Sequence, residues 1–285
     1  MKAHASCFGA GTIVNAIATG KGAAFGLGLR VNATAVVRPK GDGVKARVLD
    51  GIDTALVDAC ARRVLRRSRR KAGLEIAVDS EIPVSRGLKS SSAVANAVVL
   101  ASSRALGLDL EPLQIINLGV DAALDAGVTI TGAFDDACAS FFGAVCVTDN
   151  ASRRLLRTDR LMEDLVAVVQ IPRRVITKRS LAGKDFSPIR ARVEEAFRLA
   201  MAGDYFHAME SNSAAYAKIL EVDETPAIRA RAAGAMAAGI TGAGPAIIAL
   251  TKPAHRDAVA RALAADDAEV RMVGLNTIEA REVAP

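Results

Sequence analysis

The 285-residue sequence contains no tryptophan and only 2 tyrosines and 8 phenylalanines. Proteins that bind single-stranded nucleic acid commonly stack bases on aromatic side chains, so this shortage disfavours that class. The sequence also lacks the roughly 18–20 uninterrupted apolar residues that a membrane-spanning helix needs. Its first residues contain no continuous apolar segment typical of a secretory signal. We therefore expect a cytoplasmic protein that binds neither nucleic acid nor membranes.

Patterns typical of metal sites and disulfide frameworks are equally scarce. The four cysteines include no CxxC pair and lie in apolar or alanine-rich surroundings, which favours small buried thiols. The three histidines are scattered without ligand spacing. We therefore expect neither a structural metal site nor a disulfide framework.

Positive charge is what the sequence has in excess. It contains 37 Lys and Arg against 31 Asp and Glu, which gives a net charge of +6, and 51% of its residues are hydrophobic. Such a composition is typical of a folded globular protein, and the length suffices for one large or two modest domains. Because aromatic stacking is disfavoured, the positive charge points first to small anionic ligands.

The order of expected elements predicts an α+β fold. In the first half we expect strands at 29–37, 74–78 and 144–148, and helices at 53–71, 92–106, 112–126 and 134–140. In the second half we expect strands at 164–172, 246–251 and 268–273, and helices at 188–202, 204–220, 226–238 and 254–265. Strands separated by pairs of helices favour an α+β protein over a doubly wound sheet. We place a domain boundary after residue 160, which gives domains 1–160 and 161–285.

The segment PVSRGLKSSSA, residues 83–93, indicates an anion site at the start of a helix. Gly87 permits a backbone turn that other residues disfavour. Three serines follow it, although one would suffice as a helix cap. A helix N-terminus offers free N–H groups and a partial positive charge, to which Arg86 and Lys89 add full charges. The spacing is neither that of a Walker A loop nor that of a dinucleotide-binding GxGxxG. A serine-capped structural helix is the alternative interpretation.

Two further glycine-rich segments are candidates for close approach to a ligand. Gly239, Gly242 and Gly244 precede the strand expected at 246–251. Six glycines between residues 9 and 28 lie in an apolar stretch. A buried bend explains that second group equally well.

Two adjacent carboxylates, Asp135 and Asp136, follow a Thr-Gly turn in the segment TGAFDDA. Both cannot cap the same helix end. Adjacent helical residues diverge by about 100°, so the two side chains face different surroundings. One of them is a candidate general base or Mg²⁺-associated acid. Asp121 and Asp125, one helical turn apart, are candidates for a further acid nearby.

These motifs together resemble the signatures of the GHMP kinases, which include galactokinases, homoserine kinases, mevalonate kinases and phosphomevalonate kinases. The segment 83–93 resembles the PxxxGLxSSxA signature, and TGAGPAIIAL, residues 241–250, resembles the third, glycine-rich signature. Within the superfamily, GAGTIVNAIATGKGAAFGL, SRGLKSSSAVANA and TGAFDDA are most similar to the archaeal-type shikimate kinases. The resemblance covers essentially the whole chain.

The resemblance implies a two-domain fold with the active site between the domains. The N-terminal domain would be similar to a ribosomal-protein domain with a left-handed βαβ unit, and the C-terminal domain would be ferredoxin-like. The implied activity is transfer of a phosphoryl group from ATP, with Mg²⁺, to the 3-hydroxyl of shikimate. That reaction belongs to the pathway that leads to chorismate and the aromatic amino acids.

The resemblance also assigns roles to individual residues. ATP would be held by Pro83, Val84, Ser85, Arg86, Gly87, Leu88, Lys89, Ser90, Ser91, Ser92 and Ala93. Ser91 would be the metal-associated hydroxyl, and Asp135 aligns with the catalytic base of mevalonate and galactose kinases. The phosphate and substrate side of the cleft would be lined by Thr241, Gly242, Ala243 and Gly244.

The sequence departs from the mevalonate-type pattern at two positions. Thr12 stands where those enzymes carry a lysine, and Lys21 is displaced along the motif. Asp125 lies one position from their metal-associated glutamate and is the candidate for that role.

Shikimate carries a carboxylate, so a cationic partner is expected. The candidates are Arg173, Arg174, Lys178 and Arg179, and a solvated run of charge is the alternative for each. Three other functions are compatible with the sequence: phosphorylation of another small alcohol such as homoserine, non-catalytic binding of nucleic acid by a basic protein, and ATP binding without chemistry. The sequence does not determine the oligomeric state.

Overall fold

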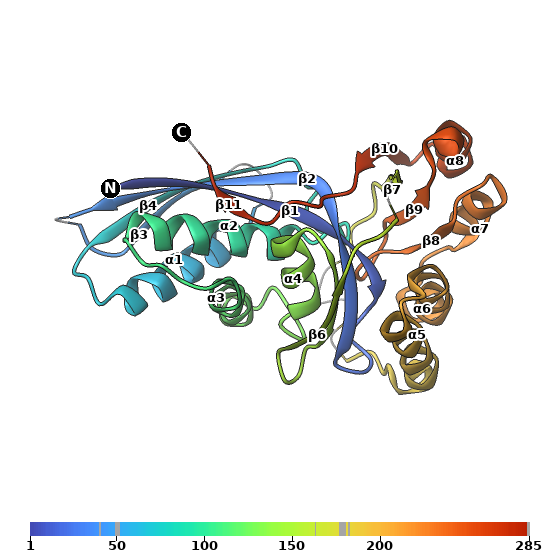
Figure 1. Cartoon of the computed structure of the whole chain (residues 1–285), viewed down its shortest axis with the longest axis horizontal. Helices are drawn as coiled ribbons and strands as arrows, with labels where there is room; N and C mark the ends of the chain where they lie inside the picture. Colours follow the sequence, from blue (N-terminus) through green and yellow to red (C-terminus); the bar gives the residue numbers. More distant parts are fainter. Residues whose placement is uncertain (40, 49–51, 163, 177–180, 182, 284–285) are drawn as a thin grey trace.

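The protein folds into two sheets, each with its own helices (Figure 1). The computed structural model describes residues 1–39, 41–48, 52–162, 164–176, 181 and 183–283. The expectation of an α+β fold is confirmed.

A long antiparallel hairpin of β1 (Lys2–Val14) and β2 (Lys21–Arg38) forms the centre of the first sheet. The strand order is β11–β1–β2–β4–β3, with β5 paired to the start of β2 and β6 paired to β5. The other strands are β3 (Val44–Val48), β4 (Gly73–Ser80), β5 (Val145–Asp149), β6 (Arg154–Asp159) and β11 (Arg281–Glu282). Strands β3 and β4 are parallel and are joined through a helix, so they form a βαβ unit.

Four helices lie on one face of this sheet (Figure 1). They are α1 (Thr54–Ser68), α2 (Ser90–Ala105), α3 (Pro112–Asp125) and α4 (Phe134–Phe142). Helix α2 contacts β1, β2 and the other three helices, and nearly all of its side chains are buried. Its alanines, valines and serines are small, so neighbouring elements pack closely around it. This packing holds the N-terminus of α2, with its three serines, in a fixed place.

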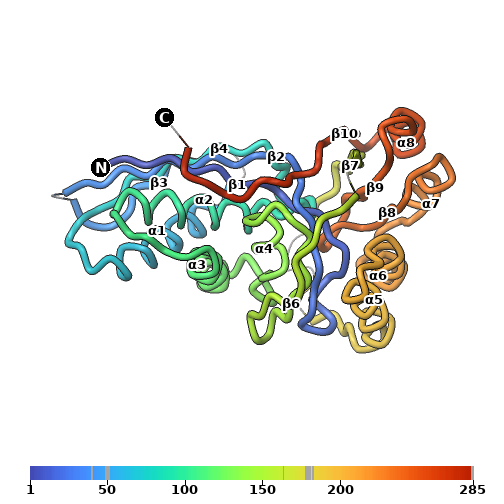
Figure 2. Tube along the Cα trace, in the orientation of Figure 1, coloured from blue at the N-terminus to red at the C-terminus, as the bar shows by residue number. Residues whose placement is uncertain are grey.

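The second sheet is antiparallel throughout, in the order β10–β7–β9–β8. Its strands are β7 (Val166–Pro172), β8 (Ala237–Ile240), β9 (Ile247–Thr251) and β10 (Ala268–Gly274). The accompanying helices are α5 (Arg190–Ala202), α6 (Tyr205–Leu220), α7 (Thr225–Ala232) and α8 (Arg256–Leu263). Helix α6 contacts both β8 and β1, so the two parts of the chain pack together. The tube in Figure 2 shows the C-terminal tail returning along the first sheet, where β11 pairs with β1.

Several expected boundaries differ from the structure. The helix expected at 226–238 ends at Ala232, because Gly234 adopts a left-handed φ of 103°, and strand β8 follows it. Strands β1, β3, β6, β8 and β11 were not predicted from the sequence. The domain division after residue 160 stays a prediction.

The N-terminal glycines lie mainly in the two strands of the central hairpin, and the β1–β2 pairing shifts register between Phe8 and Gly9. Two of them make room for the returning tail. A Cβ on Gly26 would lie 2.7 Å from the Asn276 carbonyl oxygen, and one on Gly28 would lie 2.9 Å from that of Gly274. These glycines therefore serve close backbone packing.

The four cysteines are free and buried, as expected. None of the helices in the described part of the chain is long and apolar enough to cross a membrane.

Candidate active site

Hydrogen bonds join three segments that lie far apart in the sequence. The Thr241 hydroxyl donates to the Gly87 carbonyl (2.9 Å) and accepts from the backbone N–H of Thr12 (3.2 Å). The Thr12 hydroxyl accepts in turn from the N–H of Gly242 (2.7 Å). Both threonine side chains are buried. The three glycine-rich motifs of the sequence therefore meet in one place.

The glycines of these loops permit direct backbone contact. A Cβ on Gly87 would lie 2.1 Å from the Thr241 carbonyl oxygen, and the φ of Gly87 is 85°. A Cβ on Gly242 would lie 2.9 Å from the Cα of Gly87. Any side chain at either position would separate the two loops.

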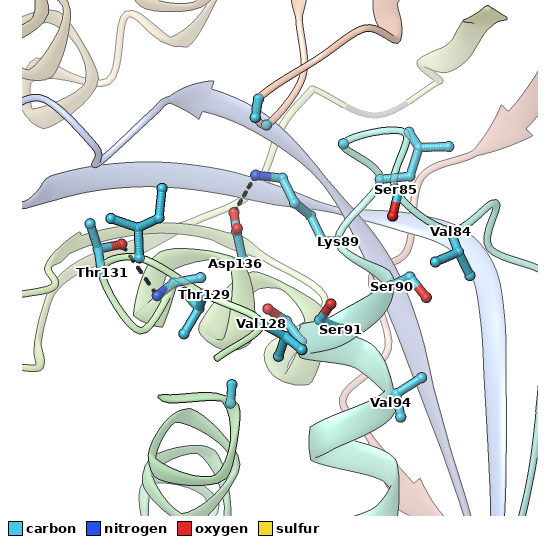
Figure 3. Close-up of a pocket in the computed structure, with 18 of the residues that line it drawn as sticks. Val84, Ser85, Lys89, Ser90, Ser91, Val94, Val128, Thr129, Thr131 and Asp136 are labelled. Atoms are coloured by element: carbon cyan, nitrogen blue, oxygen red, sulfur yellow. Dashed lines mark hydrogen bonds and ion pairs between the residues drawn. The ribbon is translucent and has the colours of Figure 1, made fainter. Parts of the chain in front are cut away.

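A cavity of about 520 Å³ opens beside the joined loops. It is lined by residues 15–17, 52–53, 56, 83–85, 87–92, 94, 123, 127–133, 135–136, 176 and 242–244. Figure 3 shows the serines of α2 on one side of it and the segment around Thr129 and Thr131 on the other. The cavity therefore combines residues of all three motifs with the two adjacent carboxylates.

The N-terminus of α2 faces this cavity without a side-chain cap. Lys89 precedes the helix in a left-handed conformation (φ 64°), and no side chain caps the helix by a hydrogen bond. The first backbone bond of the helix is donated by Ala93, so the N–H groups of Ser90, Ser91 and Ser92 have no helical partner. The interpretation as a serine-capped structural helix was therefore wrong. Free N–H groups, hydroxyls and the helix dipole together suit a phosphate.

An ion pair links this helix start to α4. Lys89 Nζ lies 2.6 Å from Asp136 Oδ1, and the two side chains are only 7% and 12% exposed (Figure 3). Among the described residues that line the cavity, Lys89 is the only basic one. Its charge is thus held at the start of α2, next to a carboxylate.

Asp135 is buried beside this pair, with 3% of its surface exposed. Asn150 Nδ2 donates to Asp135 Oδ1 (2.7 Å), and the Asp135 N–H donates to Asn150 Oδ1 (3.2 Å). Burial and, after it, the charge of Asp136 raise the pKa of Asp135 to about 6, although Lys89 and the hydrogen bond from Asn150 both lower it. A carboxylate with such a pKa is mostly ionised at neutral pH and well suited to accept a proton.

Gly22 of β2 provides the space for this carboxylate. A Cβ there would lie 2.2 Å from Asp135 Oδ2. Gly22 belongs to the N-terminal glycines expected to permit close approach, but its contact with Asp135 was not predicted, and Asn150 was not predicted as a site residue. A glycine within a strand is a known signal of close approach, but it does not indicate which side chain approaches. Nothing local in the sequence distinguishes Asn150 from an ordinary turn residue.

Most of the predicted phosphate-loop residues reach the cavity. Of the segment 83–93, all but Arg86 and Ala93 line it. Arg86 Nη2 donates to the Arg173 carbonyl (2.9 Å), and both arginines line a separate, more open groove on the outer side of the loop. Thr241 does not line the cavity, and its hydroxyl holds the loops together by hydrogen bonds. Gly242, Ala243 and Gly244 do line the cavity.

Other predicted residues are not brought to the cavity. Asp125 does not line it, and its carboxylate pairs with Arg63 through Nε (2.8 Å) and Nη2 (2.9 Å). Arg174 Nη1 donates to the Glu221 carbonyl (2.7 Å) and lies outside the cavity lining. The candidates Lys178 and Arg179 lie outside the described residues.

The displaced lysine of the first motif also has another partner. Lys21 Nζ lies 3.1 Å from Glu194 Oε2 and 5.5 Å from the centre of the Phe197 ring. Lys21 is absent from the cavity lining. The cation nearest the two carboxylates in the cavity lining is therefore Lys89 of the second motif.

The chain is similar to proteins of a known family. A family model described as the GHMP kinases N terminal domain matches residues 55–144, and one described as GHMP kinases C terminal matches residues 192–268. The sequence is 43% identical over 262 residues to a shikimate kinase of Methanothrix thermoacetophila. The matched region covers 92% of this chain and 90% of that protein. It is also 43% identical over 252 residues to a shikimate kinase of Thermococcus kodakarensis, covering 87% of this chain and 92% of that protein.

Solved structures share the fold at lower identity. A homoserine kinase from Cytophaga hutchinsonii superposes with a TM-score of 0.79 at 18% identity, covering 99% of this chain and 98% of that one. A Lactococcus lactis galactokinase in complex with galactose gives a TM-score of 0.77 at 17% identity, covering 99% and 95%. At these identities the similarity concerns the fold alone.

Proposed function

This chain belongs to the GHMP kinase family, and we propose that it transfers the γ-phosphoryl group of ATP to the 3-hydroxyl of shikimate, releasing ADP and shikimate 3-phosphate. The observation that carries this proposal is the cavity in which an uncapped helix start faces a buried carboxylate with a pKa near 6. The relatives named as shikimate kinases, 43% identical over most of the chain, support the choice of acceptor. The reaction would be a step toward the aromatic amino acids.

The N-terminus of α2 would bind the phosphates of ATP. Phosphoryl transfer depends mainly on positioning and on neutralising the charge that spreads over the transferred oxygens. The free N–H groups of Ser90–Ser92 and the ammonium group of Lys89 are fixed donors of that kind. Because the helix is packed on all sides, these donors need no rearrangement during the reaction.

The oxygen donors of the cavity fit a magnesium ion delivered with ATP. The described residues contain no group of three His, Cys, Asp or Glu side chains suited to hold a metal by themselves. Mg²⁺ usually takes one or two protein oxygens and completes its shell with phosphates and water. The Ser91 hydroxyl lines the cavity and is available for this role, whereas Asp136 is held by Lys89 in an ion pair. Bound there, the ion would neutralise phosphate charge.

Asp135 would act as the base. At neutral pH it is mostly ionised, and it would take the proton from the attacking hydroxyl. The new O–P bond forms at that hydroxyl oxygen while the bond from the γ-phosphorus to the bridging oxygen of ADP breaks. In a loose transition state the proton leaves late, so orientation of the hydroxyl is the larger part of this role.

An acceptor panel tests the proposal directly. Purified protein with ATP and Mg²⁺ is offered shikimate, homoserine or mevalonate, and ADP release is followed. We expect turnover with shikimate above the other two. Turnover with homoserine or mevalonate but not with shikimate would refute the acceptor, and salt-sensitive RNA binding without any turnover would refute the kinase activity.

A variant of the helix start tests the phosphate site. Ser91→Ala should lower kcat/KM for ATP about tenfold, which corresponds to losing about 1.4 kcal/mol from one hydrogen bond to a charged group. Ser103→Ala is the matched control, because its hydroxyl donates to the Val99 carbonyl within the same helix, away from the cavity. Equal kinetic effects of the two substitutions would show that Ser91 has no specific role with ATP.

A further inference from the structure

We infer that Asn150 is a positioning residue that holds the carboxylate of Asp135 in a single orientation for proton transfer, and that Thr148 orients the Asn150 amide. The inference rests on the proposed function, because it takes Asp135 as the base. It concerns two residues that do not line the cavity and that act only through Asp135.

Asn150 lies where three elements meet. It directly follows β5 and is 4% exposed. Its backbone N–H donates to the Gly20 carbonyl (2.8 Å) at the tip of the central hairpin. Its side chain contacts the first turn of α4 through Asp135. Movement of Asn150 is therefore restricted by the hairpin as well as by its own strand.

The hydrogen bonds allow only one orientation of the Asn150 amide. Its Oδ1 accepts from the Thr148 hydroxyl (2.6 Å) and from the backbone N–H of Asp135 (3.2 Å). A backbone N–H can only donate, so the atom that faces it must be the amide oxygen. The amide nitrogen then points to Asp135 Oδ1, 2.7 Å away. If the amide were reversed, Asn150 Oδ1 would face Asp135 Oδ1 at about this 2.7 Å distance, and two acceptors would repel each other.

The second carboxylate oxygen is confined by a strand. Asp135 Oδ2 lies over Gly22, where even a Cβ would come within 2.2 Å. Gly22 pairs with Thr148 across β2 and β5, so the same cross-strand pair supports both the carboxylate and the amide that holds it. The carboxylate therefore has a single orientation, because one oxygen is hydrogen-bonded to Asn150 and the other packs against β2.

The same hydrogen bond favours the ionised form of Asp135. A donor directed at a carboxylate stabilises its charge and lowers its pKa. Here it opposes burial and the charge of Asp136, as Lys89 also does. Three other titratable side chains interact electrostatically with Asp135, namely Cys138, Cys146 and Tyr216. Burial raises the pKa of each, so none of them ionises between pH 5 and 8.

The test compares variants that remove the donor with one that preserves the network. Asn150→Leu keeps the approximate size but removes both amide groups, and Thr148→Val removes the hydroxyl that orients the amide. Thr148→Ser is the control, since it keeps the hydroxyl. We expect Asn150→Leu to lower kcat about tenfold or more at pH 7 while KM for ATP stays within about twofold. The acid limb of its kcat profile should move to higher pH, Thr148→Val should show a smaller change of the same sign, and Thr148→Ser should resemble the wild type.

A second measurement does not depend on turnover. The carboxyl carbon of Asp135 is titrated by NMR in the wild type and in each variant, with ADP binding and melting temperature as checks on the fold. The titration midpoint should rise in Asn150→Leu and in Thr148→Val. An unchanged midpoint in folded protein, or a parallel loss of ADP binding and kcat, overturns the positioning role. If Asn150→Leu does not fold, Thr148→Val against Thr148→Ser decides the question by the same criteria.

This design separates the inference from the proposed function. The kinetic arm uses whichever acceptor the wild type phosphorylates. If that acceptor is not shikimate, the proposed substrate is wrong while Asn150 is still tested. If no acceptor is phosphorylated, the kinase proposal fails, and the carboxyl titration alone decides whether Asn150 holds Asp135.

Discussion

Substitution of Asp135 by asparagine removes one of two adjacent buried carboxylates and leaves the size of the side chain almost unchanged. With both carboxylates ionised, Asp135, Asp136 and Lys89 carry a net negative charge in a buried place. In the variant only Lys89 and Asp136 remain charged, and the net charge of this ion pair is zero. An asparagine oxygen can still accept the hydrogen bond from Asn150. We therefore expect Asp135→Asn to make the folded protein more stable and to reduce its activity.

The size of the stabilisation follows from the pKa of Asp135. A rise from 3.8 to about 6 means that the folded protein binds this proton more tightly than the unfolded chain does. The wild type therefore loses stability as the pH rises from about 4 to about 6, by about 3 kcal/mol in all at 1.36 kcal/mol per pKa unit. The asparagine variant has no such loss. Its advantage should be full at pH 8 and absent below pH 4.

Urea unfolding of both proteins at pH 5 and pH 8 measures this difference. Between these two values the advantage of the variant should grow by about half of that total, because pH 5 lies between the unfolded pKa near 4 and the folded pKa near 6. In parallel, kcat should fall about 10²- to 10⁴-fold, the range for loss of a general base. A variant less stable than the wild type at pH 8, or an advantage independent of pH, would refute the electrostatic reasoning. Retention of most activity would instead favour an acceptor chemistry that needs no strong base.

The remaining predictions concern the space, the charge and the contacts around that carboxylate. Gly22→Ala should cost about 1–3 kcal/mol of stability and at least tenfold in kcat, because the new methyl group would displace Asp135; denaturant unfolding and turnover measure both. Lys89→Met should raise KM for ATP and move the acid limb of the kcat profile to higher pH, because the pKa of Asp135 rises without the nearby cation; a pH-rate profile tests this. Thr241→Val should lower stability by about 1–3 kcal/mol, since it leaves two buried backbone groups without a partner, and should weaken ADP binding measured by calorimetry.

Matched variants control each of these experiments. Gly274→Ala adds the same methyl group to a strand where nothing lies within 4 Å, so it should leave kcat unchanged. Thr241→Ser keeps the hydroxyl and should keep the stability of the wild type. Lys89→Arg keeps the charge, so an acid limb displaced as far as in the methionine variant would contradict the electrostatic argument.

Local sequence predicts the elements of this fold well where side-chain pattern and terminators agree. Helix α2 is an example, since serines mark its start and Gly107 follows its end. The same local signals predicted an anion site there, because any helix start offers N–H groups. Strand β1 was missed because its core side is built of small residues and glycines, which show little hydrophobic alternation. Its stability comes from pairing with β2 and packing on α2, contacts that no short window contains.

Residues that work through distant partners were beyond local prediction. Asp125 and Asp135 are both aspartates of helical segments, yet Asp125 is paired with Arg63 and Asp135 is buried. Arg86 stands in the phosphate motif, but its side chain reaches the Arg173 carbonyl on the outer side of the loop. Such differences arise from which segments fold against one another, and not from residue type or spacing.

The amino-acid sequence by itself determined the α+β class and, through the resemblance of its motifs, the GHMP kinase family. It also predicted an anion site at 83–93, because turn-forming glycines and helix-start serines act over a few residues. Only the tertiary structure decided which charges share the cavity and in what state. In the folded protein Lys89 forms an ion pair with Asp136, and Gly22 leaves room for the Asp135 carboxylate. The Asn150 amide donates a hydrogen bond to that carboxylate. The ionisation of a carboxylate depends on burial and on charges within a few ångströms, and chain segments distant in sequence supply both.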